Sequence, residues 1–288
     1  MINQYKRLDV FRCNYQSHAK FENKVSVYHV LKVKKCYPQG CIYFKWKCRL
    51  INKGKRCIKG YNYIGKNCYG CSYYYDIKVH SQPIIKLSQD KYQEFLEELQ
   101  LFEDWLDEIE NHTVNFWGKI DVVKPRLHKI ISPAGNNLKL NGFTLVFREA
   151  YFDNTHFEDL CYAIISPDPQ RRFKFVGGDE VEFQAIVQVD RGRILLRKLR
   201  HIDFVNRSDN SALTYSEALV QKRTATLFYK QQKKCLTCAH GILIDVYDQS
   251  NTKQIRRREL FCLKGITDPE LCCYLLPIEN MDDEYSCP

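Results

Sequence analysis

Clustered cysteines are the residues of this chain with the clearest capacity for chemistry. Of 14 cysteines, six lie between residues 36 and 71 and five between residues 235 and 273. In each stretch one pair is separated by two residues, the spacing at which a single turn can point both sulfur atoms at one metal ion. The pattern therefore predicts a metal site in each stretch. The candidate ligands are Cys36, Cys41, Cys48, Cys57, Cys68, Cys71, Cys235, Cys238, Cys262, Cys272 and Cys273.

The first stretch holds more cysteines than one metal ion needs. A tetrahedral zinc takes four thiolates or imidazoles, so six cysteines overfill one site and underfill two unless His80 and another residue join them. A cubane iron–sulfur cluster also takes four thiolates and is the alternative to zinc, although the spacings match no cluster signature. We expect a metal to replace the core that so short and loop-rich a segment cannot build.

The second stretch predicts a hairpin that carries a metal. Two strand-like runs, residues 242–247 and 255–262, flank a polar turn, so the end of the second run should return to the first cysteine pair. The expected ligands are Cys235, Cys238, Cys262 and either Cys272 or Cys273. The arrangement resembles a zinc ribbon, in which a hairpin joins two ligand pairs, although the second pair here is spread over nine intervening residues. We expect two zinc sites in all, one in each stretch.

The net charge of +10 comes from one end of the chain. Residues 1–80 contain 17 Lys and Arg against three acidic residues, a net charge of +14, and the remainder of the chain is at −4. Charge confined to one module indicates a polyanionic partner such as nucleic acid or an anionic surface. The alternative is a lysine-coated face that only aids solubility.

Aromatic and basic side chains are interleaved within this basic region. Aromatic faces stack on unpaired bases while Lys and Arg contact phosphates, so the mixture favours single-stranded DNA or RNA. The alternative is that the aromatic residues form the core of a small domain. The candidate contacts are Lys45, Trp46, Lys47, Arg49, Lys53, Lys55 and Arg56.

The elements that must position these residues centre on a predicted hairpin over residues 177–204. Apolar and polar residues mostly alternate over residues 181–189, as in a half-buried strand. Gly192 can supply the positive φ of a tight turn, and the return arm is basic. We therefore expect a hairpin with one apolar face and one basic, solvent-exposed face.

Residues 114–205 predict five or six short strands, which suit a small barrel or sandwich. The stretch resembles the OB-fold, a five-stranded barrel, in strand number and in the entry Gly178-Asp179-Glu180-Val181 to a strand. Proteins with this fold bind single-stranded nucleic acid or oligosaccharide on one face. The resemblance implies phosphate contacts from Arg191, Arg193, Lys198 and Arg200.

The predicted fold class is mainly β with two helices (α+β). Apolar residues recur every three and four positions over residues 88–110, opposite an acidic face, and predict one helix. Thr214 and Glu217 form a capping-box pattern that predicts the second, from about residue 215 to residue 231. Residues 24–33 predict a strand, and residues 167–169 a turn. The predicted modules are a basic Cys-rich metal-binding module (1–82), an acidic amphipathic helix (83–112), an OB-like β domain (113–206) and a helix with a zinc-ribbon-like module (207–288).

The sequence favours a non-catalytic binding protein over an enzyme. Asp168 after Pro167, followed by Glu182 and Gln184, loosely resembles the PD-(D/E)xK nuclease motif, in which two carboxylates hold a magnesium ion. The cysteine content also fits an iron–sulfur redox protein, and a structural subunit of a protein complex is a further alternative. The favoured function is binding of single-stranded nucleic acid by a metal-stapled protein.

A cytoplasmic, non-membrane protein is expected. The N-terminus has no continuous apolar stretch, and no run approaches the roughly 18 apolar residues that indicate a membrane span. In a reducing compartment clustered cysteines bind metal more often than they form disulfides. A secreted, disulfide-rich protein would fit the cysteine count equally well, and the missing export signal argues against it.

Overall fold

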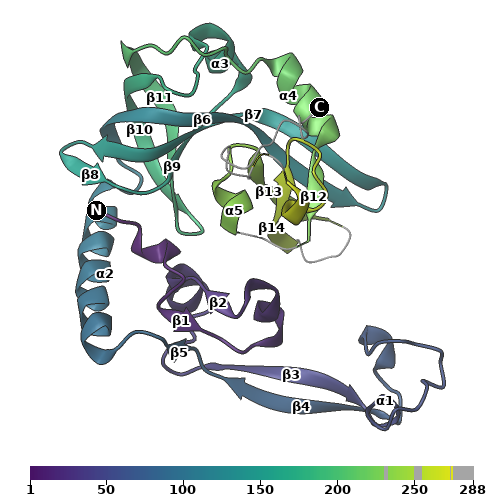
Figure 1. Ribbon diagram of the computed structural model, residues 1–288. Helices are drawn as coiled ribbons and strands as arrows, with labels where there is room; N and C mark the ends of the chain where they lie inside the picture. Colours follow the sequence, from purple (N-terminus) through teal and green to yellow (C-terminus); the bar gives the residue numbers. More distant parts are fainter. Residues whose placement is uncertain (230–232, 250–254, 273, 275–288) are drawn as a thin grey trace, which may run out of the picture. The chain divides into compact units, whose positions relative to one another are not determined.

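The protein consists of two compact units. The small unit is Arg7–Gln93, and the large unit is Met1–Lys6 together with Glu94–Pro288. The protein is mainly β with a large mixed sheet, which confirms the predicted fold class at that level. No helix in the described part of the chain is long and apolar enough to cross a membrane. The computed structural model describes residues 1–229, 233–249, 255–272 and 274 (Figure 1).

Short elements make up the small unit. β1 pairs with both β2 and β5, and β3 pairs with β4 in a separate two-stranded ribbon. Val10, Phe11 and Val27 are fully buried. The elements are β1 (Phe11–Arg12), η2 (Gln16–Phe21), β2 (Lys24–Val25), η3 (His29–Val33), β3 (Cys41–Cys48), α1 (Arg49–Asn52), η4 (Lys66–Cys68), β4 (Tyr74–Ser81) and β5 (Ile84–Ile85).

The strand predicted over residues 24–33 is wrong beyond Val25, because the chain turns into the short helix η3. The hydroxyl oxygen of Ser26 accepts a hydrogen bond from the backbone N–H of His29 at 3.3 Å, as at a helix N-cap. Val27 and Val30 are both buried, and residues three apart share one helix face. The valine pattern was therefore compatible with a helix as well as with a strand.

The large unit holds most of the strands. α2 (Gln89–Ile109) confirms the helix predicted over residues 88–110, and the division between the units falls within it. The other elements are η1 (Gln4–Lys6), β6 (Thr113–Ser132), β7 (Gly135–Phe152), β8 (Thr155–Phe157), β9 (Cys161–Ile165), α3 (Pro167–Phe173), β10 (Glu180–Asp190), β11 (Arg193–Asn206), α4 (Tyr215–Thr224), β12 (Thr226–Phe228), α5 (Lys233–Thr237), β13 (Gly241–Asp248), β14 (Ile255–Cys262) and η5 (Pro269–Leu271).

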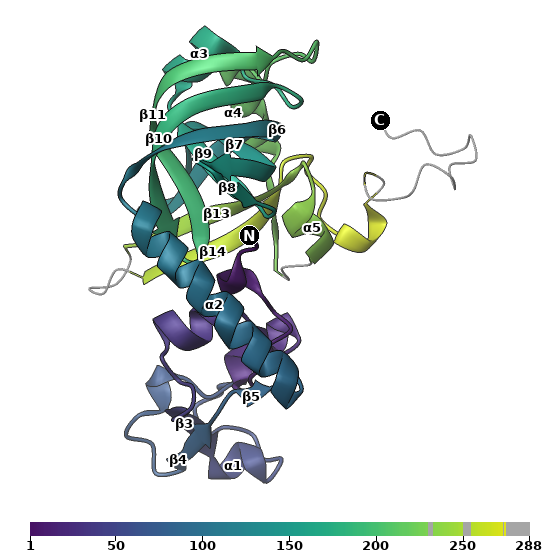
Figure 2. The same ribbon diagram turned by 90° about the vertical axis from the view of Figure 1, so that its left-hand side faces the viewer.

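Five of these strands pair in a closed order. β6 pairs with β7, β7 with β9, β9 with β11, β11 with β10, and β10 again with β6. Only the β9–β11 pairing among these five is parallel. β13 adds to β6 in parallel, and β14 and β12 continue outward, so the C-terminal strands extend the same sheet (Figure 2).

Aromatic side chains fill the interior of this strand arrangement. Phe116 on β6 stacks on Phe183 of β10 at a centroid distance of 4.6 Å and meets Phe147 of β7 edge-on at 4.8 Å. Trp105 of α2 stacks on Phe157 of β8 at 5.5 Å. Because successive strand residues point to opposite faces, an apolar interior leaves every second side chain for the outer face.

The predicted hairpin is present as β10 and β11. The connecting residues Arg191 and Gly192 have φ values of 53° and 75°, and two positive φ angles in a two-residue loop are typical of a type I′ turn. The predicted entry to the hairpin contains Asp179, which is fully buried. Its carboxylate accepts hydrogen bonds from the backbone N–H groups of Val176 and Ser208, each at 2.9 Å, so Asp179 braces this loop.

Two local predictions in the large unit are wrong. Residues 167–169 begin α3 and are not a turn, because Pro167 fits the first helical position and the acidic Asp168 suits the first helical turn. The helix α4 has the predicted capping box but ends at Thr224, since residues 226–228 pair with β14 instead.

Candidate nucleic-acid interface and metal sites

A pocket lies on the outer face of the large unit's strands, where residues of β6, β7, β9, β10, β11 and β13 gather. On β6, β7, β9 and β11 most lining residues follow the two-residue period of one strand face, to which β6 adds Asp121 and Leu127. The lining residues at this two-residue spacing are Val122, Lys124 and Arg126 on β6, Thr144, Val146 and Arg148 on β7, Tyr162 and Ile164 on β9, and Arg193, Leu195 and Arg197 on β11.

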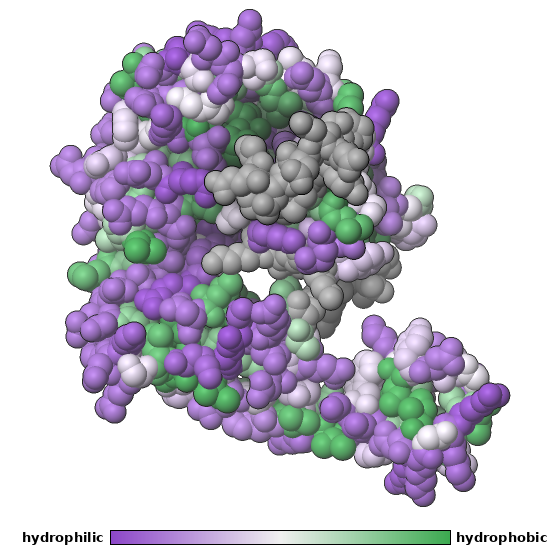
Figure 3. Space-filling model, in the orientation of Figure 1, coloured by the Kyte–Doolittle hydropathy of each residue, from purple (hydrophilic) through white to green (hydrophobic). Residues whose placement is uncertain are grey.

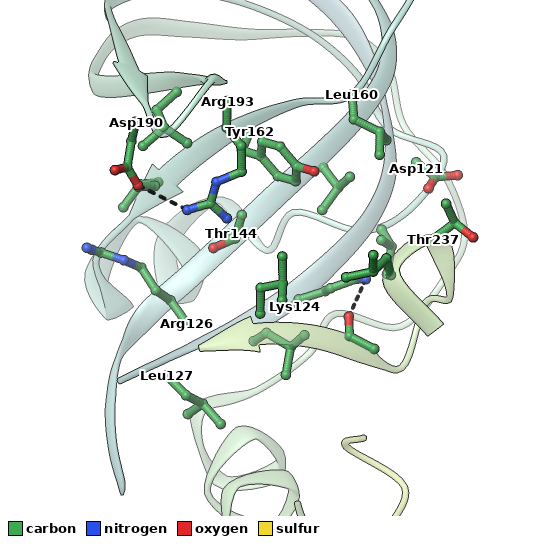
Figure 4. A pocket seen from close by; sticks show the side chains of 18 of the residues that line it. Asp121, Lys124, Arg126, Leu127, Thr144, Leu160, Tyr162, Asp190, Arg193 and Thr237 are labelled. Carbon is green, nitrogen blue, oxygen red and sulfur yellow. Dashed lines mark hydrogen bonds and ion pairs between the residues drawn. The ribbon is translucent and has the colours of Figure 1, made fainter. Parts of the chain in front are cut away.

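The far wall of the pocket comes from the C-terminal part of the chain. Thr237 of α5 and Leu243 and Asp245 of β13 line it, which follows from the pairing of β13 with β6. The pocket has a volume of about 120 Å³. Figure 4 shows Arg126, Arg193 and Asp190 on one side of the pocket and Lys124 and Thr237 on the other.

Arginine side chains dominate one side of the pocket. Burial lowers the pKa of Arg126, and the positive charges of Arg197 and Arg193 lower it further, so the three guanidinium groups influence one another. The Nε atoms of Arg193 and Arg197 are buried and have no hydrogen-bond partner within the described part of the chain. Unpartnered buried donors are costly, and an anion that accepted from them would remove that cost.

Two aspartates hold the rim of the arginine group. Asp190 pairs with Arg193 at 3.1 Å and also with Arg258. Asp245 accepts from Nε of Arg258 at 3.1 Å and lies 3.4 Å from Arg191. The aspartates therefore fix the arginine positions while neutralising part of the charge.

Lys124 has a structural role at the other side of the pocket. Its Nζ donates to the carbonyl oxygens of Cys238 at 2.7 Å and Gly241 at 2.8 Å. Burial lowers the pKa of Lys124 to about 8. The lysine thus fastens β6 to the turn that follows α5 and is not free for a ligand.

The predicted phosphate contacts of the large unit divide into two groups. Arg193 lines the pocket and Arg191 pairs with Asp245 beside it. Lys198 and Arg200 are exposed and do not line the pocket, because β11 has an irregular register after Arg197 and Lys198 has a φ of 56°. That irregularity changes which residues of the strand point outward.

Sequence reasoning missed Arg126, Arg148 and Arg197. Each lies two residues from another lining position on its strand, and this alternation was the available signal. In residues 114–165 this alternation predicts strands, but it does not indicate which outward residues share one surface. Arg148 pairs with Asp121 at 3.0 Å, so it contributes less free charge than the other two.

The predicted contacts in the small unit lie on and after β3. Lys45, Trp46 and Lys47 belong to β3, and the Trp46 ring meets that of Tyr69 edge-on at 5.5 Å, so Trp46 is half-buried. Figure 3 shows hydrophobic residues among hydrophilic ones in the region of β3, β4 and α1. The exposed basic residues are Lys45, Arg49, Lys53, Lys55 and Arg56.

The C-terminal cysteines gather where β14 ends. Gly241 pairs with Cys262, and a Cβ on Gly241 would lie 1.7 Å from the carbonyl oxygen of Cys235, so only glycine fits between them. Burial raises the pKa of the Cys235 thiol, and the thiols of Cys238, Cys272 and Cys262 raise it further. The Cys235 thiol is thus close enough to three other thiols to be influenced by them, and thiolates are ligands that zinc binds. Cys273 lies outside the described residues.

The N-terminal cysteines fall into two groups. Burial raises the pKa of the Cys36 thiol, and nearby Cys41 and Cys13 raise it further. The other group follows the opposite end of β3 and comprises Cys48, Cys57, Cys68 and Cys71. In the described part of the chain no three His, Cys, Asp or Glu side chains are already arranged as a set that could hold a metal ion. Metal binding at any of these groups therefore requires the thiols to close in.

The two carboxylates of the nuclease alternative lie on different elements, α3 and β10. Asp168 lies on α3 and pairs with Arg171 at 3.2 Å, and both side chains are exposed. Glu182 is exposed on β10, opposite Trp117 of β6.

Three comparisons with known proteins found no match for this chain. Neither a family model nor a curated protein nor a solved structure matches the chain.

Proposed function

We propose that the closed strand order of the large unit is an OB-like barrel. Numbered along the chain, β6, β7, β9, β10 and β11 are strands one to five, and their pairings run 1-2-3-5-4 and back to 1. The third and fifth strands pair in parallel, and α3 lies between the third and fourth. OB-folds bind on the face of strands two and three, beside the loops between strands one and two and between four and five.

The proposed function is binding of single-stranded nucleic acid on this face. The observation that carries it is the group of Arg126, Arg193 and Arg197, because two of its Nε donors are buried without a partner in the described part of the chain. Guanidinium groups match phosphate oxygens with paired hydrogen bonds, and a backbone phosphate would satisfy these donors. Asp190 and Asp245 hold the rim in place before the ligand arrives.

The size and lining of the pocket favour a single strand over a duplex. A volume of about 120 Å³ admits a phosphate or a sugar but no duplex. Tyr162 adds a half-buried ring, with the Arg193 guanidinium 5.4 Å from its centroid, so a base can stack beside a cation. The small unit would supply a second basic surface. It consists of the exposed residues Lys45, Arg49, Lys53, Lys55 and Arg56.

Zinc is the proposed cofactor, and at the C-terminal cysteines its role would be structural. Zinc held by Cys235, Cys238, Cys262 and Cys272 would fix α5 and the start of β13, which form one wall of the pocket. A four-thiolate iron–sulfur cluster is the alternative there, and metal analysis with an absorption spectrum separates the two.

The function is tested by two matched substitutions on one strand. Arg197→Ala and Arg200→Ala each remove one positive charge from β11, but only Arg197 lines the pocket. We expect Arg197→Ala to weaken binding of a labelled single-stranded oligonucleotide about 10-fold or more in fluorescence anisotropy, because a charged hydrogen bond is worth about 1.5–3 kcal/mol. Arg200→Ala should have a clearly smaller effect.

The salt dependence supplies the second readout. The logarithm of affinity falls as the logarithm of salt concentration rises. Each lost phosphate contact should make this negative slope less steep by about 0.7 for a single strand. Equal effects of the two substitutions would show a generic basic surface and overturn the pocket assignment. Binding of a neutral oligosaccharide with equal affinity would overturn the nucleic-acid assignment.

A further inference from the structure

The β3–β4 ribbon separates the small unit's cysteines into two places. Cys41 begins β3 and Cys48 ends it, so they are separated by the length of an eight-residue strand. At about 3.3 Å per residue the two Cα atoms are about 23 Å apart. Two sulfur atoms on one zinc are at most about 4.6 Å apart, since each Zn–S bond is about 2.3 Å. No single metal ion can therefore bind both cysteines.

One group lies at the start of β3. Cys41 is paired opposite Ser81, and the Ser81 hydroxyl oxygen is 3.7 Å from the Sγ of Cys13. Cys36 is in the turn that precedes β3, where the backbone N–H of Gly40 donates to its carbonyl oxygen at 2.7 Å. Cys13 is thus brought to the same end of the ribbon as Cys36 and Cys41, and Cys13 was not among the predicted ligands.

His80 is the proposed fourth ligand at this end, and because it pairs with Ile42 its ring must turn from the ribbon face opposite Cys41 to reach the thiols. It neighbours Ser81 on β4, and its Nε2 lies 2.9 Å from the carbonyl oxygen of Gln39. A carbonyl oxygen only accepts, so Nε2 carries the hydrogen and Nδ1 keeps its lone pair. Metal-binding histidines commonly hold their second nitrogen in this way. Gly40 lies beside the ring and has a φ of 79°, a backbone conformation that favours glycine.

The other four cysteines lie at the end of β3 or in the segment that connects β3 and β4 at the far end of the ribbon. Cys48 pairs with Tyr74, whose backbone N–H donates to the carbonyl oxygen of Cys71 at 2.9 Å. The backbone N–H of Cys71 in turn donates to the carbonyl oxygen of Cys68 at 3.1 Å, which closes the two-residue knuckle. The Sγ of Cys57 accepts a hydrogen bond from the backbone N–H of Lys59 at 3.4 Å.

The far end lacks a buried apolar core. None of the residues from Arg49 to Tyr73, all of which the structure describes, is buried, although this segment connects the two strands of the ribbon. Ile58 and Tyr63 expose 66% and 79% of their surface. An isolated two-stranded hairpin is marginally stable in water, so a segment of this kind needs another source of folding free energy.

We propose that the small unit binds two zinc ions, one at each end of the β3–β4 ribbon. The first is held by Cys13, Cys36, Cys41 and Nδ1 of His80, and the second by Cys48, Cys57, Cys68 and Cys71. This rests on the proposed zinc cofactor and is independent of nucleic-acid binding. With the C-terminal site, the chain then binds three zinc ions. A three-sulfur, one-nitrogen set suits zinc and does not supply the four thiolates of a cubane cluster.

The test is the zinc content of the full-length protein and of two variants. By native mass spectrometry we expect three zinc ions in the wild type and two each in Cys13→Ser and Cys71→Ser. The double variant should retain one, because the two sites are independent. A double variant that loses no more zinc than each single variant would show one shared site and overturn the assignment, as would an unchanged zinc content in Cys13→Ser.

A second measurement needs no variant and so does not depend on whether the variants fold. As a chelator removes zinc from the wild type, cysteines of one site should become reactive to a thiol-alkylating reagent together. Peptide mapping should show Cys13, Cys36 and Cys41 released in one step and Cys48, Cys57, Cys68 and Cys71 in another. Release of Cys41 together with Cys48, apart from Cys13, would overturn the proposal. Oligonucleotide binding by the large unit's pocket is read separately, through Arg197→Ala.

Discussion

The two units maintain their folds by different means. In the large unit β-strands enclose aromatic side chains such as Phe116 and Phe183, whose stacked rings are 3% exposed or less. In the small unit the described residues from Arg49 to Tyr73 include no buried side chain at all. Both units carry basic residues on their surface, yet an apolar core positions one set and the cysteines are proposed to position the other. Loss of metal should therefore damage one basic surface far more than the other.

Metal removal should give the largest effect. Structural zinc contributes an apparent binding free energy of about 10–16 kcal/mol to small zinc domains, so a strong chelator should unfold residues 49–73 locally. Hydrogen exchange measured by mass spectrometry should show these residues losing protection while β10 and β11 keep theirs. Equal loss of protection in the two regions, or none in residues 49–73, would contradict the comparison.

A pair of phenylalanine truncations tests the same difference between the units without removing metal. Phe116→Ala should lower the free energy of unfolding of the large unit by about 3–5 kcal/mol, because it leaves a cavity among stacked rings. Phe44→Ala on β3 is the matched control, since Phe44 is 59% exposed. Its effect should stay within about 0.5 kcal/mol. Denaturant titrations followed by tryptophan fluorescence measure both, and similar losses would show that the two units do not differ in this way.

The smallest effect concerns the aspartate at the rim of the arginine group. Burial alone would raise the pKa of Asp190, but Arg258 and Arg193 outweigh it and hold the pKa below the ordinary value of 3.8. The folded state then binds a proton less readily than the unfolded state, so the stabilisation is present above pH 3.8 and is lost as the pH falls through the folded-state pKa.

Asp190→Asn should therefore cost about 1–3 kcal/mol at neutral pH. The difference in Tm between this variant and the wild type should shrink on acidification below about pH 4. A Tm difference that is constant with pH would show that the ionised carboxylate is not the stabilising group.

Several features of the fold followed from local sequence. The alternation in residues 181–189, the amphipathic period of α2 and the capping box of α4 all appear in the structure. These patterns depend on interactions within a few residues, so no tertiary information is needed to predict them. Where two local patterns competed, as at η3, the buried positions of Val27 and Val30 decided the outcome.

By itself the sequence determined where the thiols and the charges are along the chain, and that the strands alternate. Only the tertiary structure decided which of them meet. Arg126 and Arg197 come together because β6 and β11 contribute outward positions to one pocket, and Cys13 reaches Cys36 through the pairing of β1 and the turn before β3. Which strands pair depends on the burial of side chains that are distant in sequence. The spacing of residues along the chain therefore does not predict the pairing.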